Sequence, residues 1–301
     1  MILNAGAGEA AQRAIVIVGA ARSGTTMMGT LLGSLQQIEY LHEPPLLHSL
    51  LTQIDILPAT SWRLLYETYL FEDFLIDAVA GRRLNLNRND ESSVYHSKSA
   101  AEVQSRLARS WRRTEAYPEA RNRRICYKIP DMVGFLGRLF SIYSEMTTVV
   151  MIRRAESVIR SLLERGWYSD CGLSGVTGIW PNHPSAPPYA PYWLPAAEIE
   201  TWRHMSEIER CCYYYVTLYG DLPDHPGIVA VDYDRFVRDA PRQLSHIAAR
   251  LGHNFGSQTD PLLAKIAEPA GDRVVNLSMV PSALLERLRA TEAKIKNRAL
   301  E

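Results

Sequence analysis

The chain has 301 residues, of which 47% are hydrophobic and 22% are charged, so it can bury a sizeable globular core. Lysine and arginine total 33, and aspartate and glutamate also total 33, so no overall field favours nucleic acid or an anionic membrane. The four cysteines lack metal-ligand spacing, and the apolar run 14–18 is too short to span a membrane. We therefore expect a cytoplasmic protein with no membrane span and no nucleic-acid partner.

Apolar β-branched runs alternate with helical periodicity, which predicts an α/β fold with a mostly parallel central sheet flanked by helices. The predicted strands are 14–18, 38–41, 124–129, 147–152 and 227–231. The predicted helices are 25–36, 61–80, 99–117, 156–165, 196–219, 240–251 and a last helix that begins at Pro281. Residues 1–12 are predicted to be disordered, and 13–301 to form a single domain.

The segment 166–195 has neither periodicity and is dense in glycine, proline, tryptophan and tyrosine. Loops of this length in compact domains are commonly lids or binding loops. Its aromatic side chains could pack against a ring of a substrate, or they could fix the loop to the domain. They are Trp167, Tyr168, Trp180, Tyr189, Tyr192 and Trp193.

The most specific feature is the sequence GAARSGTT between the first predicted strand and the following helix. Backbone N–H groups in such a loop, at the positive end of a helix dipole, form a concave site for an anion. Gly19 and Gly24 allow a tight turn and a close approach of a phosphate. The hydroxyls of Ser23, Thr25 and Thr26 can donate hydrogen bonds to its oxygens. A simple helix-capping turn is the alternative.

The two glycines of this loop have the spacing of a Walker A motif. However, Thr25 stands where the lysine of nucleotide hydrolases belongs, and the basic residue comes earlier, at Arg22. This argues against an ordinary ATPase or kinase. A P-loop kinase-like phosphotransferase remains an alternative at this point.

The run Arg22-Ser23-Gly24-Thr25-Thr26 after a buried strand resembles the 5′-phosphosulfate-binding loop of sulfotransferases that use 3′-phosphoadenosine 5′-phosphosulfate (PAPS). The consensus sequence of this loop in the family is K/R-S-G-T-S/T. The resemblance implies a three-layer P-loop-like fold, with the basic residue on the phosphosulfate and the loop amides on the 5′-phosphate. Among the family's members, the motifs are most similar to those of carbohydrate and bacterial sulfotransferases.

A second motif of the same family is an arginine at a strand end with a serine eight positions later, which together bind the 3′-phosphate. Arg153 and Ser161 have this separation, and Arg153 follows a predicted strand, at the end where open α/β sheets bind ligands. The planar guanidinium suits a phosphate dianion. The sequence departs from the family pattern at Ala155, where proline is common, and at Glu156, near where a basic residue often stands.

Weaker similarities point to the same family. The segment VDYDRF (231–236) resembles a strand-to-helix element of the family, and Lys128 with Pro130 resembles its K-x-P strand end. We predict that Arg273 belongs to the loop that covers the nucleotide.

Sulfuryl transfer resembles phosphoryl transfer, so the site needs cations around the leaving phosphate and a base beside the attacking hydroxyl. Arg22 and the loop amides meet the first need, and Lys128 is a candidate to assist near the bridging oxygen. The sequence YLHEP resembles an element in which carbohydrate sulfotransferases place a glutamate beside the acceptor. Glu43 is the first candidate base, and His42 is the rival because imidazole titrates near neutral pH. Both could instead be polar residues before a turn.

We thus predict a PAPS-dependent O-sulfotransferase that acts on a hydroxyl of a carbohydrate or small-molecule acceptor and needs no metal. A non-catalytic nucleotide-binding module, with the aromatic segment as a partner surface, is the other alternative. The exposed helix 99–117 or the last helix could carry the contact of a homodimer.

Overall fold

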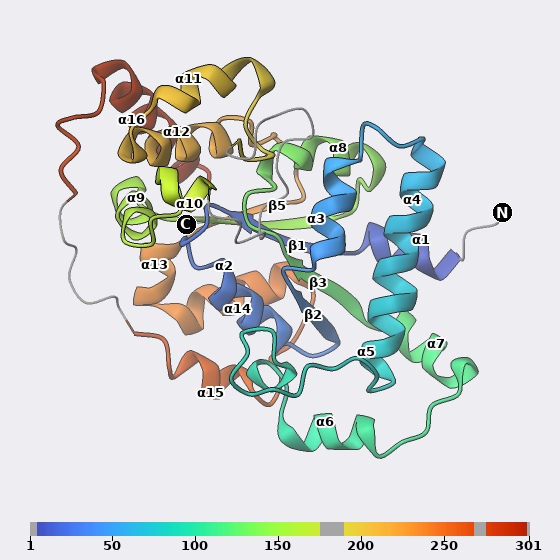
Figure 1. Ribbon diagram of the computed structural model, residues 1–301. Helices are drawn as coiled ribbons and strands as arrows, with labels where there is room; N and C mark the ends of the chain where they lie inside the picture. Colours follow the sequence, from blue (N-terminus) through green and yellow to red (C-terminus); the bar gives the residue numbers. More distant parts are fainter. Residues whose placement is uncertain (1–4, 175–189, 268–274, 300–301) are drawn as a thin grey trace.

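The computed structural model of the protein describes residues 5–174, 190–267 and 275–299. Five strands form one sheet in the order β2-β3-β1-β4-β5, and every neighbouring pair is parallel (Figure 1). The strands are β1 (Ile15–Gly19), β2 (Ile38–His42), β3 (Arg124–Lys128), β4 (Thr147–Ile152) and β5 (Ile228–Asp232). All five predicted strands are confirmed, each within one residue of its expected bounds.

The sheet separates two apolar cores, because successive side chains of a strand point to opposite faces. In β1, Ile15 and Ile17 belong to the smaller core, whereas Val16 and Val18 belong to the larger one. Burial on both faces explains why this strand is a continuous apolar run. The smaller core is covered by α2 (Thr25–Gly33), α13 (Tyr233–Arg238), α14 (Ala240–Leu251) and α15 (Thr259–Leu263).

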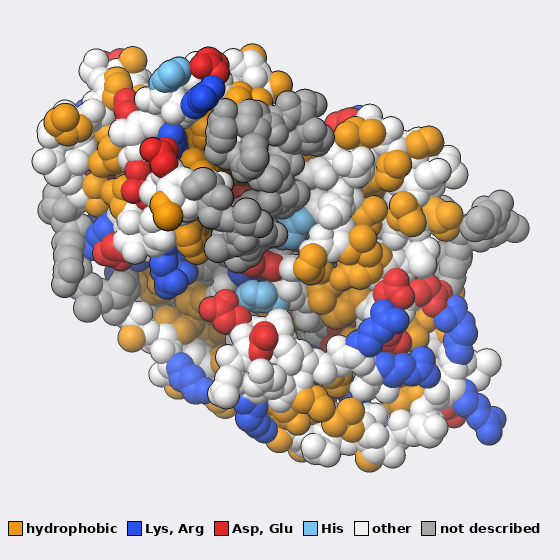
Figure 2. All heavy atoms as spheres, viewed as in Figure 1, with side chains coloured by type: hydrophobic (Ala, Val, Ile, Leu, Met, Phe, Trp, Pro, Cys, Tyr) orange, Lys and Arg blue, Asp and Glu red, His pale blue; other side chains and the backbone are white. Residues whose placement is uncertain are grey.

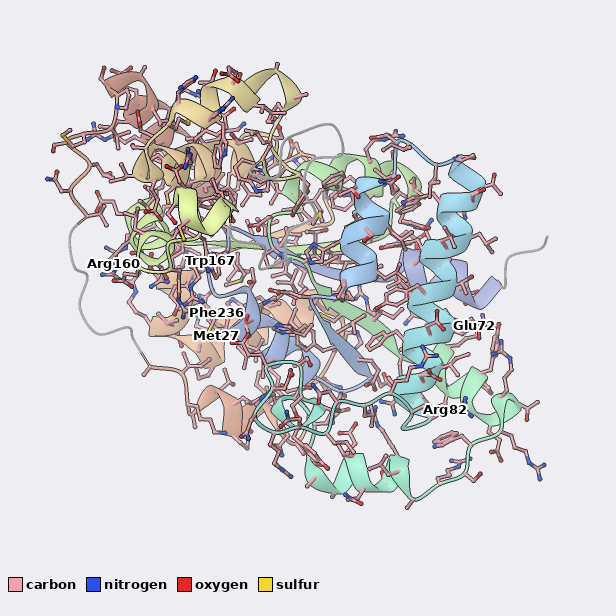
Figure 3. All side chains as sticks on the ribbon, viewed as in Figure 1. Met27, Glu72, Arg82, Arg160, Trp167 and Phe236 are labelled. Atoms are coloured by element: carbon pink, nitrogen blue, oxygen red, sulfur yellow. The ribbon has the colours of Figure 1, made fainter. Side chains whose placement is uncertain are left out.

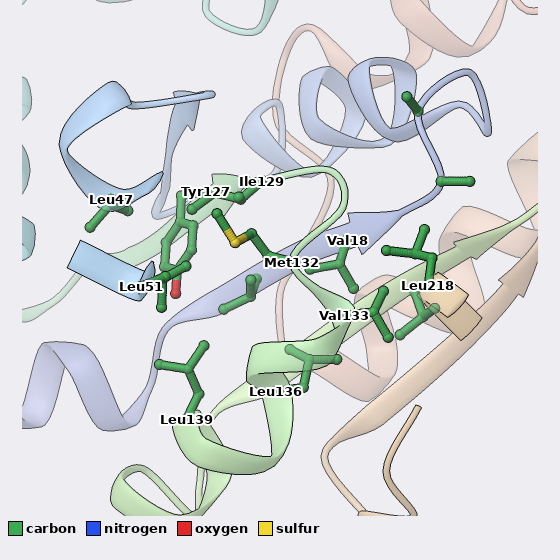
Figure 4. Packing of buried hydrophobic residues seen from close by; sticks show 14 of the residues in the cluster. Val18, Leu47, Leu51, Tyr127, Ile129, Met132, Val133, Leu136, Leu139 and Leu218 are labelled. Atoms are coloured by element: carbon green, nitrogen blue, oxygen red, sulfur yellow. The ribbon is translucent and has the colours of Figure 1, made fainter. Parts of the chain in front are cut away.

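The larger core lies on the other face of the sheet, where helices form the third layer of the molecule. Figure 4 shows the packing of buried side chains in this core. Its helical segments are α1 (Ala5–Gln12), α3 (Pro45–Thr52), α4 (Ala59–Thr68), the π-helical η1 (Tyr69–Ile76), α5 (Asp77–Val79), α7 (Arg113–Arg121), the 3₁₀ turn η3 (Val133–Phe135), α8 (Leu136–Ile142), α9 (Ala155–Leu163), α11 (Ile199–His204), α12 (Glu207–Gly220) and α16 (Ser282–Lys296). The remaining short segments are η2 (Val94–His96), α6 (Ala100–Leu107), α10 (Asp170–Ser174) and η4 (Ala196–Glu198).

Three sequence predictions differ from this arrangement. The segment 1–12 was expected to be disordered, but α1 forms there because Ala7 and Ala11 are small enough to pack into the larger core. The predicted helix 99–117 is interrupted between α6 and α7. The predicted helix 196–219 is also divided, because Ser206 and Glu209 form a capping box that starts α12 anew.

The described ends of the aromatic segment pack against the domain. The Tyr168 ring lies 5.6 Å from that of Trp202 and 5.2 Å from that of Tyr214, and the Trp193 ring lies 5.3 Å from that of Tyr214. These contacts fix both ends of the segment to α11 and α12. Trp180 and Tyr189 lie outside the described residues. Over the described part of the chain, no helix is long and apolar enough to cross a membrane.

Candidate functional site

The carboxyl ends of all five strands meet at one edge of the sheet, which is where open α/β sheets bind ligands. Four of the elements there carry predicted site residues. The residues at this edge are the GAARSGTT loop after β1, Glu43 after β2, Lys128 at the end of β3, Arg153 after β4 and Tyr233 after β5. The strand order therefore places the candidate base beside β2 and β3, and the candidate anion-binding cations beside β1 and β4.

The loop after β1 reverses direction through three residues with positive φ, namely Gly19 at 141°, Arg22 at 71° and Gly24 at 89°. Gly24 is the N-cap of α2 and no side chain caps this helix, so its first N–H groups are available to an anion. The Ser23 hydroxyl donates to the Ala20 carbonyl at 2.6 Å. Ser23 therefore stabilises the loop itself, while Thr25 is buried in the first turn of α2.

Gly24 offers a direct test of the loop, because a Cβ at this position would overlap the ring of Tyr233. Gly252 has a similar φ of 74°, but a Cβ there would meet nothing within 4 Å. We expect Gly252→Ala to lower the free energy of unfolding by about 1 kcal/mol through backbone strain, and Gly24→Ala to lower it further because of the overlap with Tyr233. Only Gly24→Ala should also weaken binding of adenosine 3′,5′-bisphosphate, measured by calorimetry. Equal binding by both variants would contradict this role of the loop.

Three predicted site residues converge beside the loop. The Arg22 Nε donates to the Ser161 Oγ at 3.0 Å, and the Arg153 Nη1 donates to the Arg22 carbonyl at 2.9 Å. The Arg153 Nε is buried and has no hydrogen-bond partner, and the guanidinium carbon lies 4.6 Å from the centre of the Tyr233 ring. An unpaired buried donor of this kind favours an acceptor supplied by a ligand.

The electrostatics of this cluster also favour an anion. Burial lowers the pKa of Arg22 from its ordinary value, and the positive charges of Arg165 and Arg153 lower it further. Glu91 and Glu164 act in the opposite direction but do not cancel these effects. A phosphate group among these guanidinium groups would relieve their mutual repulsion.

Lys128 connects the GAARSGTT loop, the candidate phosphate loop, to the candidate base. Its Nζ donates to the Thr26 Oγ1 at 2.6 Å and lies 2.6 Å from the Glu43 Oε1. Glu43 has a φ of 40°, and its backbone N–H donates to the Lys128 carbonyl at 3.1 Å. The lysine side chain is buried, and its two contacts fix the position of the Glu43 carboxylate relative to the loop.

The two histidines near Glu43 have different surroundings. The His42 Nδ1 lies 3.4 Å from the Tyr40 hydroxyl, and its Nε2 lies 3.8 Å from the Glu91 carboxylate. Burial and Lys128 lower the pKa of His42. His48, on α3, was not predicted from the sequence. Its Nδ1 is buried without a partner, and its pKa is lowered by burial, raised by Glu43 and lowered by Lys128.

The position of His48 follows from helix geometry, since side chains of a helix lean toward its N-terminus. His48 stands in the first turn of α3, which begins directly after Glu43 and Pro44. The closeness of His48 to Glu43 in the sequence was the signal that could have identified it. Figure 2 shows histidine and acidic side chains gathered at a hollow in the middle of one face of the molecule.

Two tyrosines of α12 bond the backbone of the candidate phosphate loop, and they were not predicted from the sequence. The Tyr219 hydroxyl accepts from the Ala20 N–H at 2.9 Å and donates to the Met151 carbonyl at 2.6 Å. The Tyr214 hydroxyl accepts from the Ala21 N–H at 2.6 Å. In the sequence they are two of several aromatic residues in one predicted helix, which gave no sign of a polar role.

An apolar pocket of about 310 Å³ lies beside α2, the helix that follows the loop, on the side of the smaller core. Figure 3 shows two of the residues in this region, Met27 on α2 and Phe236 on α13. Tyr233 separates the pocket from Arg153, since its ring lies against both the pocket and the guanidinium. The pocket is lined by Met27, Thr30, Leu31, Tyr233, Val237, Leu262, Lys265, Ile266 and Ala267.

Two further predictions concern the edges of the site. Arg273 lies outside the described residues, so its predicted contact with a nucleotide stays a prediction. Within residues 5–174, 190–267 and 275–299, histidine, cysteine, aspartate and glutamate form no group of three or more that could hold a metal ion.

Comparisons with known proteins agree with the motifs. Residues 14–174, more than half of the chain, match the model of a family described as the sulfotransferase family. A solved sulfotransferase domain of the Synechococcus PCC 7002 olefin synthase is similar at 13% identity, with 94% of each chain covered and a TM-score of 0.48. A sulfotransferase from Mycobacterium avium is similar at 11% identity, with 95% of this chain and 76% of that chain covered and a TM-score of 0.49. No curated protein matches the sequence significantly.

Proposed function

The chain belongs to the sulfotransferase family, and from this premise we propose that it transfers a sulfuryl group from PAPS to a hydroxyl group. The acceptor is a carbohydrate or another small molecule, and the second product is adenosine 3′,5′-bisphosphate. A hydroxyl acceptor needs a base that can take its proton, and the Glu43 carboxylate beside Lys128 is the candidate for this role.

The observation that carries this proposal is the convergence of Arg22, Arg153 and Ser161. These residues come from the loop after β1, the end of β4 and helix α9, yet they lie in one hydrogen-bonded cluster. A site for a nucleoside triphosphate needs cations along a single chain of phosphate groups. Cations gathered from two strands, around an uncapped helix N-terminus, suit a nucleotide with phosphate groups at two separate positions.

The apolar pocket next to Tyr233 supports the same donor. A nucleotide whose 5′-phosphate lies on the loop amides needs a nearby apolar space for its base, and this pocket lies beside the helix that follows the loop. Aromatic and aliphatic side chains that line it can contact the faces of a purine ring. We propose that the adenine lies there.

On the acceptor side, Glu43 accepts the proton of the attacking hydroxyl. The ion pair with Lys128 holds its carboxylate in a fixed position, as a general base requires. Lys128 also bonds Thr26 at the start of α2, so its charge lies between the base and the loop. There it stabilises the negative charge that develops on the leaving phosphate oxygen. His42 contacts Tyr40 and Glu91, and it stays the alternative base.

The proposal is tested by incubating the protein with PAPS and a panel of hydroxyl compounds, namely oligosaccharides, phenols and long-chain alcohols. We expect formation of adenosine 3′,5′-bisphosphate and of a sulfated product in equal amounts for at least one acceptor, with and without EDTA. A parallel incubation with ATP and Mg²⁺ covers the kinase alternative. Phosphorylated product there, with no sulfated product from PAPS, would contradict the proposal.

A further inference from the structure

Asp131 is a buried carboxylate directly beneath the phosphate loop. It follows β3 and Pro130, has only 1% of its surface exposed, and adopts a φ of 66°. Aspartate tolerates this left-handed conformation better than most side chains, although it is uncommon. Its backbone N–H donates to the Gly19 carbonyl at 3.2 Å, so the residue is tied to the loop through its main chain as well.

The side chain of Asp131 bridges the loop and helix α12. Its Oδ1 accepts hydrogen bonds from the Ala21 N–H at 3.3 Å and from the Tyr214 hydroxyl, while the Tyr214 hydroxyl itself accepts from Ala21. Its other oxygen, Oδ2, is buried and has no hydrogen-bond partner. A buried carboxylate with hydrogen bonds to only one of its oxygens is destabilised when it is ionised. Protonation of the other oxygen removes the charge.

The groups around Asp131 have opposing effects on the pKa of its carboxyl group. Burial raises its pKa to about 7, against the bonds from Tyr214 and Ala21 that lower it. Glu43 raises this pKa further and Lys128 lowers it. The other titratable side chains that face Asp131 are the phenols of Tyr168, Tyr192 and Tyr219, whose own pKa values are raised by burial. These phenols are neutral near pH 7 and add no charge.

We propose that Asp131 is a positioning residue of the phosphate loop whose protonation is coupled to nucleotide binding. In the free protein near neutral pH, its carboxylate holds Ala21 and Tyr214. When phosphate groups occupy the loop, their negative charge disfavours the carboxylate, and Asp131 takes up one proton on Oδ2 from solvent. This inference rests on the proposed binding of PAPS and its product at the loop.

The sign of the pH dependence follows from this coupling. Below pH 7, Asp131 is already protonated and does not repel the nucleotide, so affinity is highest there. As the pH rises through 7, binding must include uptake of a proton, and affinity falls. The phosphate groups of the nucleotide themselves have the opposite effect, because they lose their last protons near pH 6 and bind more tightly as dianions.

The test is calorimetric titration of the protein with adenosine 3′,5′-bisphosphate at pH 6.5 and pH 8, in two buffers of different ionisation enthalpy. Wild type is expected to bind about fivefold more weakly at pH 8 and to take up protons on binding. Asp131→Asn keeps an oxygen acceptor for Ala21 and Tyr214 without the charge. It should bind at pH 8 at least as tightly as at pH 6.5, with no proton uptake.

Two further variants separate this coupling from a purely structural role. Tyr214→Phe removes a donor to the carboxylate, so the midpoint of the pH dependence should move to higher pH. Glu67→Gln changes another buried carboxylate, which bonds Tyr143 and Arg63 instead of the loop, and it should keep the pH dependence of wild type.

The outcomes are distinguishable. Tight binding by wild type with the same pH dependence in Asp131→Asn would overturn the coupling and leave the proposed function standing. Failure of wild type to bind the bisphosphate at either pH would overturn the proposed function and the coupling together.

Discussion

Replacing Glu43 by glutamine is expected to lower kcat for sulfuryl transfer by about 10²- to 10⁴-fold, the contribution typical of a positioned general base. Glutamine keeps the shape of the side chain and can still accept a hydrogen bond from Lys128, but it cannot take the proton of the acceptor hydroxyl. Binding of adenosine 3′,5′-bisphosphate should change little, because Glu43 lies on the acceptor side of Lys128. The measurement is the rate of bisphosphate formation at saturating PAPS and acceptor.

Glu91→Gln is the matched control for this experiment. Glu91 is another carboxylate at the same edge of the site, near His42, but its side chain is 80% exposed and contacts neither Lys128 nor the loop in the described interactions. Its replacement should change kcat less than about threefold. If Glu43→Gln retained activity and His42→Asn did not, the base would be His42.

Replacing Arg153 by alanine is expected to weaken binding of adenosine 3′,5′-bisphosphate by about 10- to 100-fold, since hydrogen bonds to charged groups contribute about 1.5–3 kcal/mol. The variant removes the buried, unpartnered Nε and the bond to the Arg22 carbonyl, as well as the contact with the Tyr233 ring. Calorimetry measures the loss directly.

Arg154→Ala provides the control, because this neighbouring arginine is more exposed and its Nε lies 3.2 Å from Asp234. Its loss should leave the affinity within about threefold of wild type. Equal weakening by both variants would mean that the cluster attracts anions only through its overall charge, and the assignment of Arg153 to a phosphate would be wrong.

The sequence predicted the sheet well because each strand is a short apolar run whose burial on both faces leaves a local pattern. The two motifs that resemble nucleotide-binding elements could be found in the sequence for a related reason, since each lies just after such a strand. Once the strands are placed in parallel, Arg22 and Arg153 must reach the same edge. The hydrogen bond from the Arg153 Nη1 to the Arg22 carbonyl confirms that they lie side by side.

Other parts of the site depend on contacts that no local pattern records. Tyr214 and Tyr219 are two of many buried residues of α12, and only the fold shows that their hydroxyls meet the loop. Asp131 bonds Ala21 and Tyr214, which are far from it in the sequence. The short helix α1 was missed because alanine is only weakly apolar, and its burial depends on partners far along the chain.

We propose that the loop after β1 and Arg153 bind a nucleotide phosphorylated at two separate positions. The most direct measurement is calorimetric titration of wild type with adenosine 3′,5′-bisphosphate, beside ATP with Mg²⁺. We predict that the bisphosphate binds much more tightly than ATP and needs no metal ion. Tight, Mg²⁺-dependent binding of ATP with no binding of the bisphosphate would contradict the account.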